Sequence, residues 1–243
     1  MMDRNQAINK MAYAMTERPR CFYVKGKPFF LNPATLGMVQ VCTPLLRDLS
    51  VDQELATLSA EGEILRVCND DRMKVCVLIA YRTCRTKEEI YNEPRIQKLA
   101  NYLNSYMPLA DMASILIYII NEIQSSVDDI EEALGITDER RWLSRAIETK
   151  MKNDDHGGSL TFGGRSIYGS LIGHFCKEYG WTFQYVMWGI SLVNLKLLHD
   201  DEVTTISLSK EELRMSGVPT DRSAAMMNYR DAVAKYANAF DNA

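Results

Sequence analysis

The chain contains three histidines, and the residues beside them are the ones whose types could do chemistry. His156 follows Asp154 and Asp155, and carboxylate and imidazole groups are ligands that metal ions accept. Three adjacent side chains, however, rarely converge on one ion without partners from elsewhere in the chain. We therefore expect no metal site, because the sequence shows no ligand set with a workable spacing.

The other two histidines could act as catalytic bases. His174 lies two residues before Cys176, but residues two apart on a helix point to different faces, so they do not form a base and its nucleophile. His199 begins an acidic turn that ends at Glu202, and such a cluster supports acid–base chemistry only if burial perturbs it. We expect the turn to be solvated, and we therefore expect no catalytic residue, no cofactor and no enzymatic activity.

A glycine-rich segment from Gly157 to Gly164 precedes a helical pattern, as phosphate-binding loops do. It lacks the Gly-Lys-Ser/Thr ending whose lysine and hydroxyl hold phosphate and magnesium, so we interpret it as a flexible connector. The six cysteines have no CxxC spacing, which argues against a zinc ribbon or a thioredoxin-like site. We expect them to be small buried hydrophobic residues in a reducing cytoplasm.

The bulk composition is that of an ordinary globular protein. Among 243 residues, 47% are hydrophobic and 25% charged, which is enough apolar surface for a proper core. The net charge of −4 provides no basic footprint for a nucleic acid, so we do not expect a nucleic-acid partner. The first 20 residues contain no apolar run typical of a secretory signal, and the apolar segment from Met112 to Ile123 is too short to span a membrane.

The hydrophobic periodicity predicts a mainly α protein, with a multi-helix, bundle-like body and a small N-terminal β-hairpin. We divide the chain into an N-terminal arm at 1–18, a hairpin plus helical body at 19–153, a loop at 154–165 and a C-terminal helical region at 166–243. The hairpin is expected at Cys21–Lys25 and Pro28–Leu31, with the turn at Gly26 between them.

Local signals predict where several helices start and stop. Asn32 and Pro33 are typical of a helix start, and Pro44 is expected to interrupt that helix. A capping box at Ser50 predicts one helix that continues to Val67. Gly135 should separate two helices in the charged stretch that follows. A last helix is expected from Asp221 to Phe240.

The stretch from Ser166 to His199 is interpreted as two apolar helices joined by a turn. Gly180 can end the first helix with a positive φ, and Thr182 can cap the second, which is expected to continue to Leu198. Large hydrophobic residues cover more of this second helix than one stripe, so it is either central to a core or partly reserved for another protein. A helix-turn-helix DNA-binding regulator is an alternative, although the helix offers few polar or basic side chains to bases and phosphates.

Two stretches, FYVKGKPFFLNPATLG at 22–37 and YGWTFQYVMWGISLVNLKLL at 179–198, resemble tail assembly chaperones of tailed bacteriophages and prophages. In that family a short hairpin precedes a helical body, and a later helix follows a Gly-aromatic-Ser/Thr turn. The resemblance implies a non-enzymatic helper in the cytoplasm of a bacterial host. It also implies that the partners are phage tail proteins, namely the tape-measure and tail-tube proteins, and not a membrane.

Three aromatic residues and one leucine in the second of these stretches are the candidate protein-binding residues: Trp181, Tyr185, Trp188 and Leu192. Together with 13 methionines that can repack against different surfaces, they are what a transient protein-binding surface would use. The alternative for each of them is that it fills the core. The alternative for the whole chain is a structural virion component, such as a tail or connector subunit.

Overall fold

The computed structural model of the chain describes residues 3–124, 128–153, 166, 168–202, 204 and 206–218. The loop expected at 154–165 lies outside these residues, and so does the helix expected from Asp221. The described residues form two compact units. The first contains the elements from α1 to α9 and from η1 to α13, and the second contains α10 and α14.

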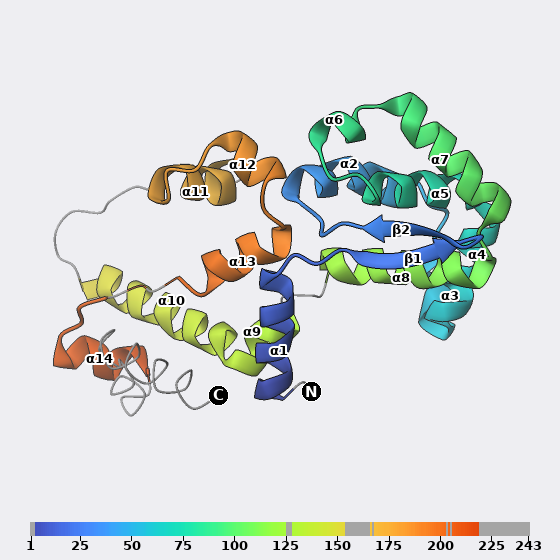
Figure 1. Cartoon of the computed structure of the whole chain (residues 1–243). Helices are drawn as coiled ribbons and strands as arrows, with labels where there is room; N and C mark the ends of the chain where they lie inside the picture. The colour runs from blue at the N-terminus through green and yellow to red at the C-terminus, as the bar shows by residue number, and fades with distance from the viewer. Residues whose placement is uncertain are drawn as a thin grey trace, which may run out of the picture. The chain divides into compact units, whose positions relative to one another are not determined.

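The protein is mainly α-helical with one two-stranded hairpin near the N-terminus, as the sequence predicts (Figure 1). Its first unit begins with α1 (Arg4–Met15), β1 (Arg20–Val24), β2 (Lys27–Leu31) and α2 (Leu36–Arg47). It continues with α3 (Gln53–Leu58), α4 (Ala60–Asp70), α5 (Arg72–Arg82), α6 (Lys87–Ile90), α7 (Glu93–Tyr106), α8 (Leu109–Gln124) and α9 (Asp128–Leu134). The last elements of this unit are the π-helical turn η1 (Tyr168–Ile172), α11 (Gly173–Glu178), α12 (Phe183–Trp188) and α13 (Leu192–Asp200).

The second unit consists of α10 (Ile136–Asn153) and α14 (Lys210–Ser216). Ser209 caps α14 and forms the expected capping box with Glu212, and Gly217 ends that helix with φ +63°. Gly135, with φ +80°, separates α9 from α10 as predicted. No helix among the described residues has both the length and the apolarity needed to cross a membrane.

The hairpin is closed by a two-residue turn at Lys25 and Gly26, which both have positive φ. Positive φ at both central positions matches the right-handed twist of the strands, and glycine adopts it without steric cost. The antiparallel register pairs Phe22 with Phe29, whose rings stack at 5.5 Å. Figure 1 shows the hairpin running beside α8.

The main core of the first unit gathers around α5, of which one face is completely buried. Its buried members come from the hairpin, from α2 and α4 to α8, and from residues just after α2, α5 and α7: Val24, Leu31, Met38, Cys42, Leu49, Val67, Cys68, Val75, Cys76, Leu78, Ile79, Ala80, Cys84, Ile90, Ile96, Ala100, Leu103, Met107, Met112, Ala113, Ile115, Leu116 and Ile119. Four of the six cysteines are in this set, as free thiols, and burial raises the pKa of each to about 11. They act as small hydrophobic side chains there, as expected.

A second cluster of the same unit joins the start of α2 to the helices near the end of the unit. Its buried members are Ala34, Leu36, Val39, Ile172, Phe175, Val186, Met187, Ile190, Leu192 and Leu195. Trp188 contacts both clusters, and its ring lies over Gly37, where an added Cβ would come within 2.6 Å of it. Glycine at that position is therefore required by close packing.

Three of the predicted helix boundaries are wrong. The helix expected at Asn32 begins at Leu36, capped by the Thr35 hydroxyl, and continues through the exposed Pro44, where water can satisfy the carbonyl that proline leaves free. The single helix expected up to Val67 is two helices, because Ser59 adopts an extended conformation and caps α4. The Asn32 side chain, which was expected at the start of a helix, donates hydrogen bonds to the carbonyls of Thr83 and Cys84 just after α5.

The helix expected from Thr182 to Leu198 is also two helices, α12 and α13. Gly189 ends the first, and Ser191 caps the second by accepting the N–H of Asn194 at 3.3 Å. The excess of apolar positions arises largely from this break, because each short helix buries a face of its own. Phe183 and Leu198 nevertheless remain 45% and 40% exposed.

Candidate functional site

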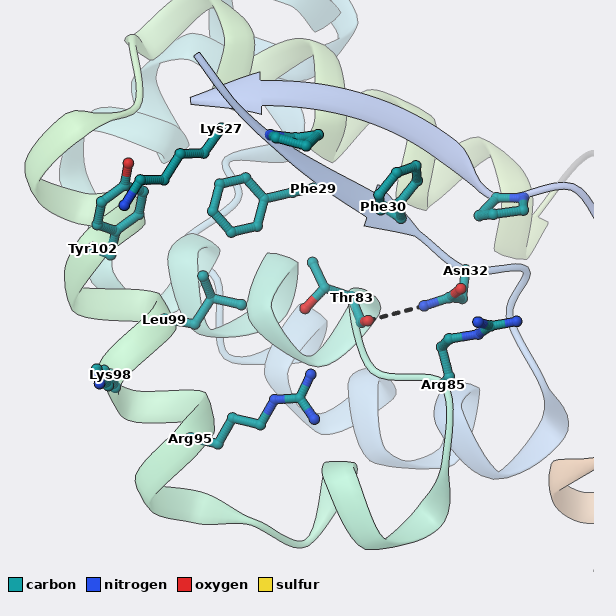
Figure 2. A pocket seen from close by; sticks show the side chains of 12 residues that line it. Lys27, Phe29, Phe30, Asn32, Thr83, Arg85, Arg95, Lys98, Leu99 and Tyr102 are labelled. Carbon is teal, nitrogen blue, oxygen red and sulfur yellow. Dashed lines mark hydrogen bonds between the residues drawn. The ribbon is translucent and has the colours of Figure 1, made fainter. Parts of the chain in front are cut away.

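A groove of about 620 Å³ lies between strand β2, helix α7 and the loop after α5 (Figure 2). These segments are far apart in the sequence and meet only in the folded first unit. The groove is lined by Pro19, Lys27, Pro28, Phe29, Phe30, Asn32, Thr83, Arg85, Arg95, Lys98, Leu99 and Tyr102. Its volume is in the range of pockets that hold a small ligand or a few side chains of a partner.

Aromatic and aliphatic side chains form the floor of the groove. The Phe29 ring lies 5.9 Å from the ring of Tyr102 on α7. Leu99, one turn before Tyr102 on the same helix, also lines the floor. The Tyr102 hydroxyl donates a hydrogen bond to the carbonyl of Val24 at 3.3 Å, which fixes the hairpin against α7. In Figure 2, Arg95 and Leu99 extend from α7 toward the hairpin.

Asn32 holds the two walls of the groove together. Its side-chain amide donates to the carbonyls of Thr83, at 2.9 Å, and Cys84, at 3.2 Å, and its backbone N–H donates to the carbonyl of Arg82 at 3.1 Å. Carbonyls at the C-terminus of a helix have no partner within the helix, so Asn32 satisfies those of Arg82 and the cap residue Thr83 from outside, together with the carbonyl of Cys84 just after the cap. The end of β2 is thereby attached to the end of α5, and the groove is preformed (Figure 2).

The rim of the groove is positively charged, since Lys27, Arg85, Arg95 and Lys98 line it and no acidic residue of the described part of the chain does. The Lys27 ammonium lies 5.4 Å from the centre of the Tyr102 ring. The side chains of Arg85 and Lys98 are exposed. This local excess of positive charge lies on a chain whose net charge is −4.

One acidic residue behind the rim holds part of it in place. Glu89 accepts the backbone N–H of Arg85 at 2.7 Å and forms an ion pair with the Arg95 guanidinium. Both contacts favour the charged carboxylate, so they hold the pKa of Glu89 below its usual value. The ion pair likewise raises the pKa of Arg95, which remains charged in the groove.

The four predicted protein-binding residues lie at different depths. Tyr185 is 44% exposed and Trp181 is half-buried, whereas Leu192 is buried and donates its backbone N–H to the carbonyl of Ala34 at 2.7 Å. Trp188 is half-buried between the two core clusters. Tyr185 is therefore the member of the set that a partner can reach most directly.

Trp181 and Tyr185 belong to a connected group of rings, the aromatic cluster, made of Phe175, Tyr179, Trp181 and Tyr185. Trp181 stacks on the fully buried Phe175 with ring centres 5.3 Å apart and an angle of 8°. Tyr185 meets Trp181 edge-on at 5.1 Å, and Tyr179 is 40% exposed. The cluster connects the hydrophobic interior to an aromatic surface, which is typical of protein-binding sites.

Beside this cluster the structure brings His174, His199 and Glu202 together, with one donor atom of each within 4.8 Å of the others. The expectation of no metal site did not consider this set of residues, and it stays a prediction. It rested on residues adjacent in sequence, whereas these three come from α11, α13 and the residue after the turn that ends α13. Only the spacing of His199 and Glu202, three residues apart, could have indicated the site.

The sequence also missed the groove, because its cations come from three segments and each alone resembles an ordinary solvated residue. The one local signal is that Arg95 and Lys98 are three residues apart on α7 and so share a face. No family model, curated protein or solved structure matches the chain.

Proposed function

We propose that the chain is a non-enzymatic binding factor whose groove holds an extended, acidic segment of a partner protein. The observation that supports this most is the combination of a preformed aromatic floor with a rim of Lys27, Arg85, Arg95 and Lys98. Guanidinium groups bind carboxylates with defined geometry, and an aromatic floor takes the apolar side chains between them.

The charge distribution gives this binding its direction. A chain with net charge −4 repels an acidic partner in general, whereas the cations of the groove attract it locally, which favours one orientation of the segment. Because Asn32 holds the walls in place before binding, little ordering of the groove opposes association.

The partner in this proposal is a phage tail protein, either the tape-measure or the tail-tube protein, and the chain acts as a tail assembly chaperone. The support is the resemblance of the stretches at 22–37 and 179–198, together with their positions in the fold. The first stretch forms the hairpin wall of the groove, and the second supplies most of the aromatic cluster. They also pack on each other, since Thr35 pairs with Ser191 and Gly37 lies under Trp188.

The test is co-expression of the full chain with the tape-measure and tail-tube proteins encoded nearby, followed by co-purification. The groove variant is Arg85→Glu with Lys98→Glu, which reverses two exposed charges. The control is Arg4→Glu with Lys10→Glu, which makes the same change in net charge on exposed positions of α1. We expect the groove variant to lose the complex and the control to retain it.

Capture of either tail protein by the parent chain, lost only in the groove variant, supports the proposal. Equal capture by both variants shows that the groove is not the binding site, and no capture by the parent excludes these partners. A fixed number of copies of the chain per purified phage particle would instead indicate a virion subunit. A DNA-binding regulator has little support, because the second helix of its expected motif, α12, contains no lysine or arginine.

A further inference from the structure

Two histidines on neighbouring helices lie close together, and each has one buried ring nitrogen without a hydrogen-bond partner among the described residues. The imidazole rings of His174 on α11 and His199 on α13 are 5.1 Å apart between centres. The Nε2 atom of His174 and the Nδ1 atom of His199 are buried and make no hydrogen bond to any described residue. Buried polar atoms are normally paired, so an orphaned nitrogen on each of two neighbouring imidazoles points to a further occupant of the site.

Glu202 supplies a negative charge to the same place. Its Oε2 atom lies 3.3 Å from the Nε2 atom of His174, and the two atoms do not have the geometry of a hydrogen bond. A protonated His174 would aim its N–H at the carboxylate, so a simple ion pair does not explain the contact. A nitrogen lone pair and a carboxylate that face one space are instead arranged as donors to a cation.

The distances match a small divalent ion. Tetrahedral zinc with Zn–N and Zn–O bonds of about 2.0–2.1 Å places neighbouring ligand atoms about 3.3–3.4 Å apart. The His174–Glu202 distance of 3.3 Å is that separation, and all three donor atoms lie within 4.8 Å of one another. Small side-chain rotations would bring the remaining distances to it.

We propose that His174, His199 and Glu202 bind a divalent transition-metal ion, with Zn²⁺ as the best match. Two imidazoles and one carboxylate suit zinc, whereas calcium and magnesium take oxygen ligands. Three protein ligands leave the fourth tetrahedral position open to water or to a group from a partner. The ion would link α11 to the end of α13, and this assignment does not depend on the proposed protein partner.

Packing around the site holds the rings ready for the ion. Phe175 meets the His174 ring at 5.4 Å and 81°, and it lies 6.5 Å from the His199 ring. Because Phe175 is fully buried, it restricts the orientations that both imidazoles can adopt. Preorganised ligands lose little side-chain freedom when the ion binds.

The test uses the full chain, freed of metal with a chelator and then titrated with Zn²⁺ and, separately, with Co²⁺. We expect one ion per chain and the visible absorption of tetrahedral Co²⁺. His174→Ala and His199→Ala should each weaken Zn²⁺ binding by more than about 100-fold, because even the loss of a group that only orients a ligand costs about 10- to 100-fold. Glu202→Gln, at a partly exposed position, keeps the side-chain size and should also weaken Zn²⁺ binding. This variant tests the site even if a histidine variant fails to fold.

His156→Ala is the matched control, because it removes the remaining histidine of the chain. It should bind Zn²⁺ as the parent does. Absence of stoichiometric binding by the parent would overturn the assignment. So would binding that the three ligand variants retain, or binding that is lost only in His156→Ala or only after alkylation of the thiols.

Discussion

Arg82, fully buried at the end of α5, donates a hydrogen bond to the carboxylate of Glu122 near the end of α8. The other oxygen of that carboxylate accepts the backbone N–H of Ala34 at 3.2 Å. This ion pair connects two central helices to the segment that leads into α2. A charge at that depth is tolerated only with its partner in place.

Replacing Arg82 alone should destabilise the protein strongly. Arg82→Met leaves the Glu122 carboxylate buried without its cation, and such losses cost about 3–5 kcal/mol. Urea unfolding of the variant and the parent measures the difference. The double variant Arg82→Met with Glu122→Met should recover much of the loss, because neither charge then remains.

The control for this prediction is Lys177→Met. The Lys177 side chain is 84% exposed and lies 3.2 Å from Glu178, so water solvates both charges and the unfolding midpoint should not change. If Arg82→Met unfolds at the same urea concentration as Lys177→Met, the buried ion pair does not stabilise the fold.

The turn between α11 and α12 should be sensitive to two small changes. The Thr182 hydroxyl accepts the N–H of Tyr185 at 3.2 Å, so Thr182→Ala should cost about 1 kcal/mol, whereas Thr182→Ser keeps the cap. Gly180 has φ +66° with open space around it, so Gly180→Val is strained by its backbone conformation alone. Thermal unfolding tests both, and unchanged melting temperatures would contradict the capping of this turn.

Two of the predicted binding residues should respond differently to polar substitution. Tyr185→Ser changes an exposed ring and should weaken partner capture by about 2 kcal/mol, the scale of an interface hot spot, with an unchanged circular dichroism spectrum. Leu192→Ser puts a hydroxyl into the second core cluster and should lower the melting temperature. Normal capture by Tyr185→Ser would restrict the partner surface to the groove.

Glu63 should contribute to the acid sensitivity of the fold. The Arg66 guanidinium, at 2.7 Å, and the N–H of Asp52, also at 2.7 Å, hold the pKa of this nearly buried carboxylate at about 2. A pKa lowered on folding stabilises the protein above the unfolded value of about 4.3, and the contribution is lost as the pH falls toward 2.

The variant Glu63→Gln removes this contribution. It should be less stable than the parent at pH 7, and its free energy of unfolding should fall less between pH 4.5 and pH 2. Chemical denaturation at several pH values measures both. Parallel curves for the two proteins would show that Glu63 keeps an ordinary pKa in the native state.

Short-range signals predicted much of this fold, because they act within a few residues. Gly180, Thr182 and Ser209 were identified as caps from sequence, and each has the expected conformation or hydrogen bond. The prediction failed where two local signals competed. Ser191 is a good N-cap, but the apolar run around it favoured one continuous helix, and the break is stabilised by tertiary contacts of Ser191 with Glu17 and of Leu192 with Ala34.

The candidate sites could not be predicted in the same way, because tertiary contacts create them. The carboxyl group of Glu202, just after α13, is within ion-pair distance of His174 on α11. The cations of the groove likewise become neighbours only after β2 packs on α7. Hydrophobic periodicity gives the faces of helices but not which faces meet.

The contact between Glu17 and the start of α13 constrains how the chain matures during synthesis. The Glu17 carboxylate accepts the N–H of Ser191 at 2.8 Å across 174 residues, and it also accepts the side-chain amide of Asn194. At translation rates of about 5–20 residues per second, Ser191 emerges from the ribosome roughly 9–35 s after Glu17 does. During that interval the apolar face of α2 that later packs against Ile190 and Leu192 is exposed to solvent. A nascent chain whose translation stalls in this interval therefore exposes an apolar surface that can aggregate with other chains.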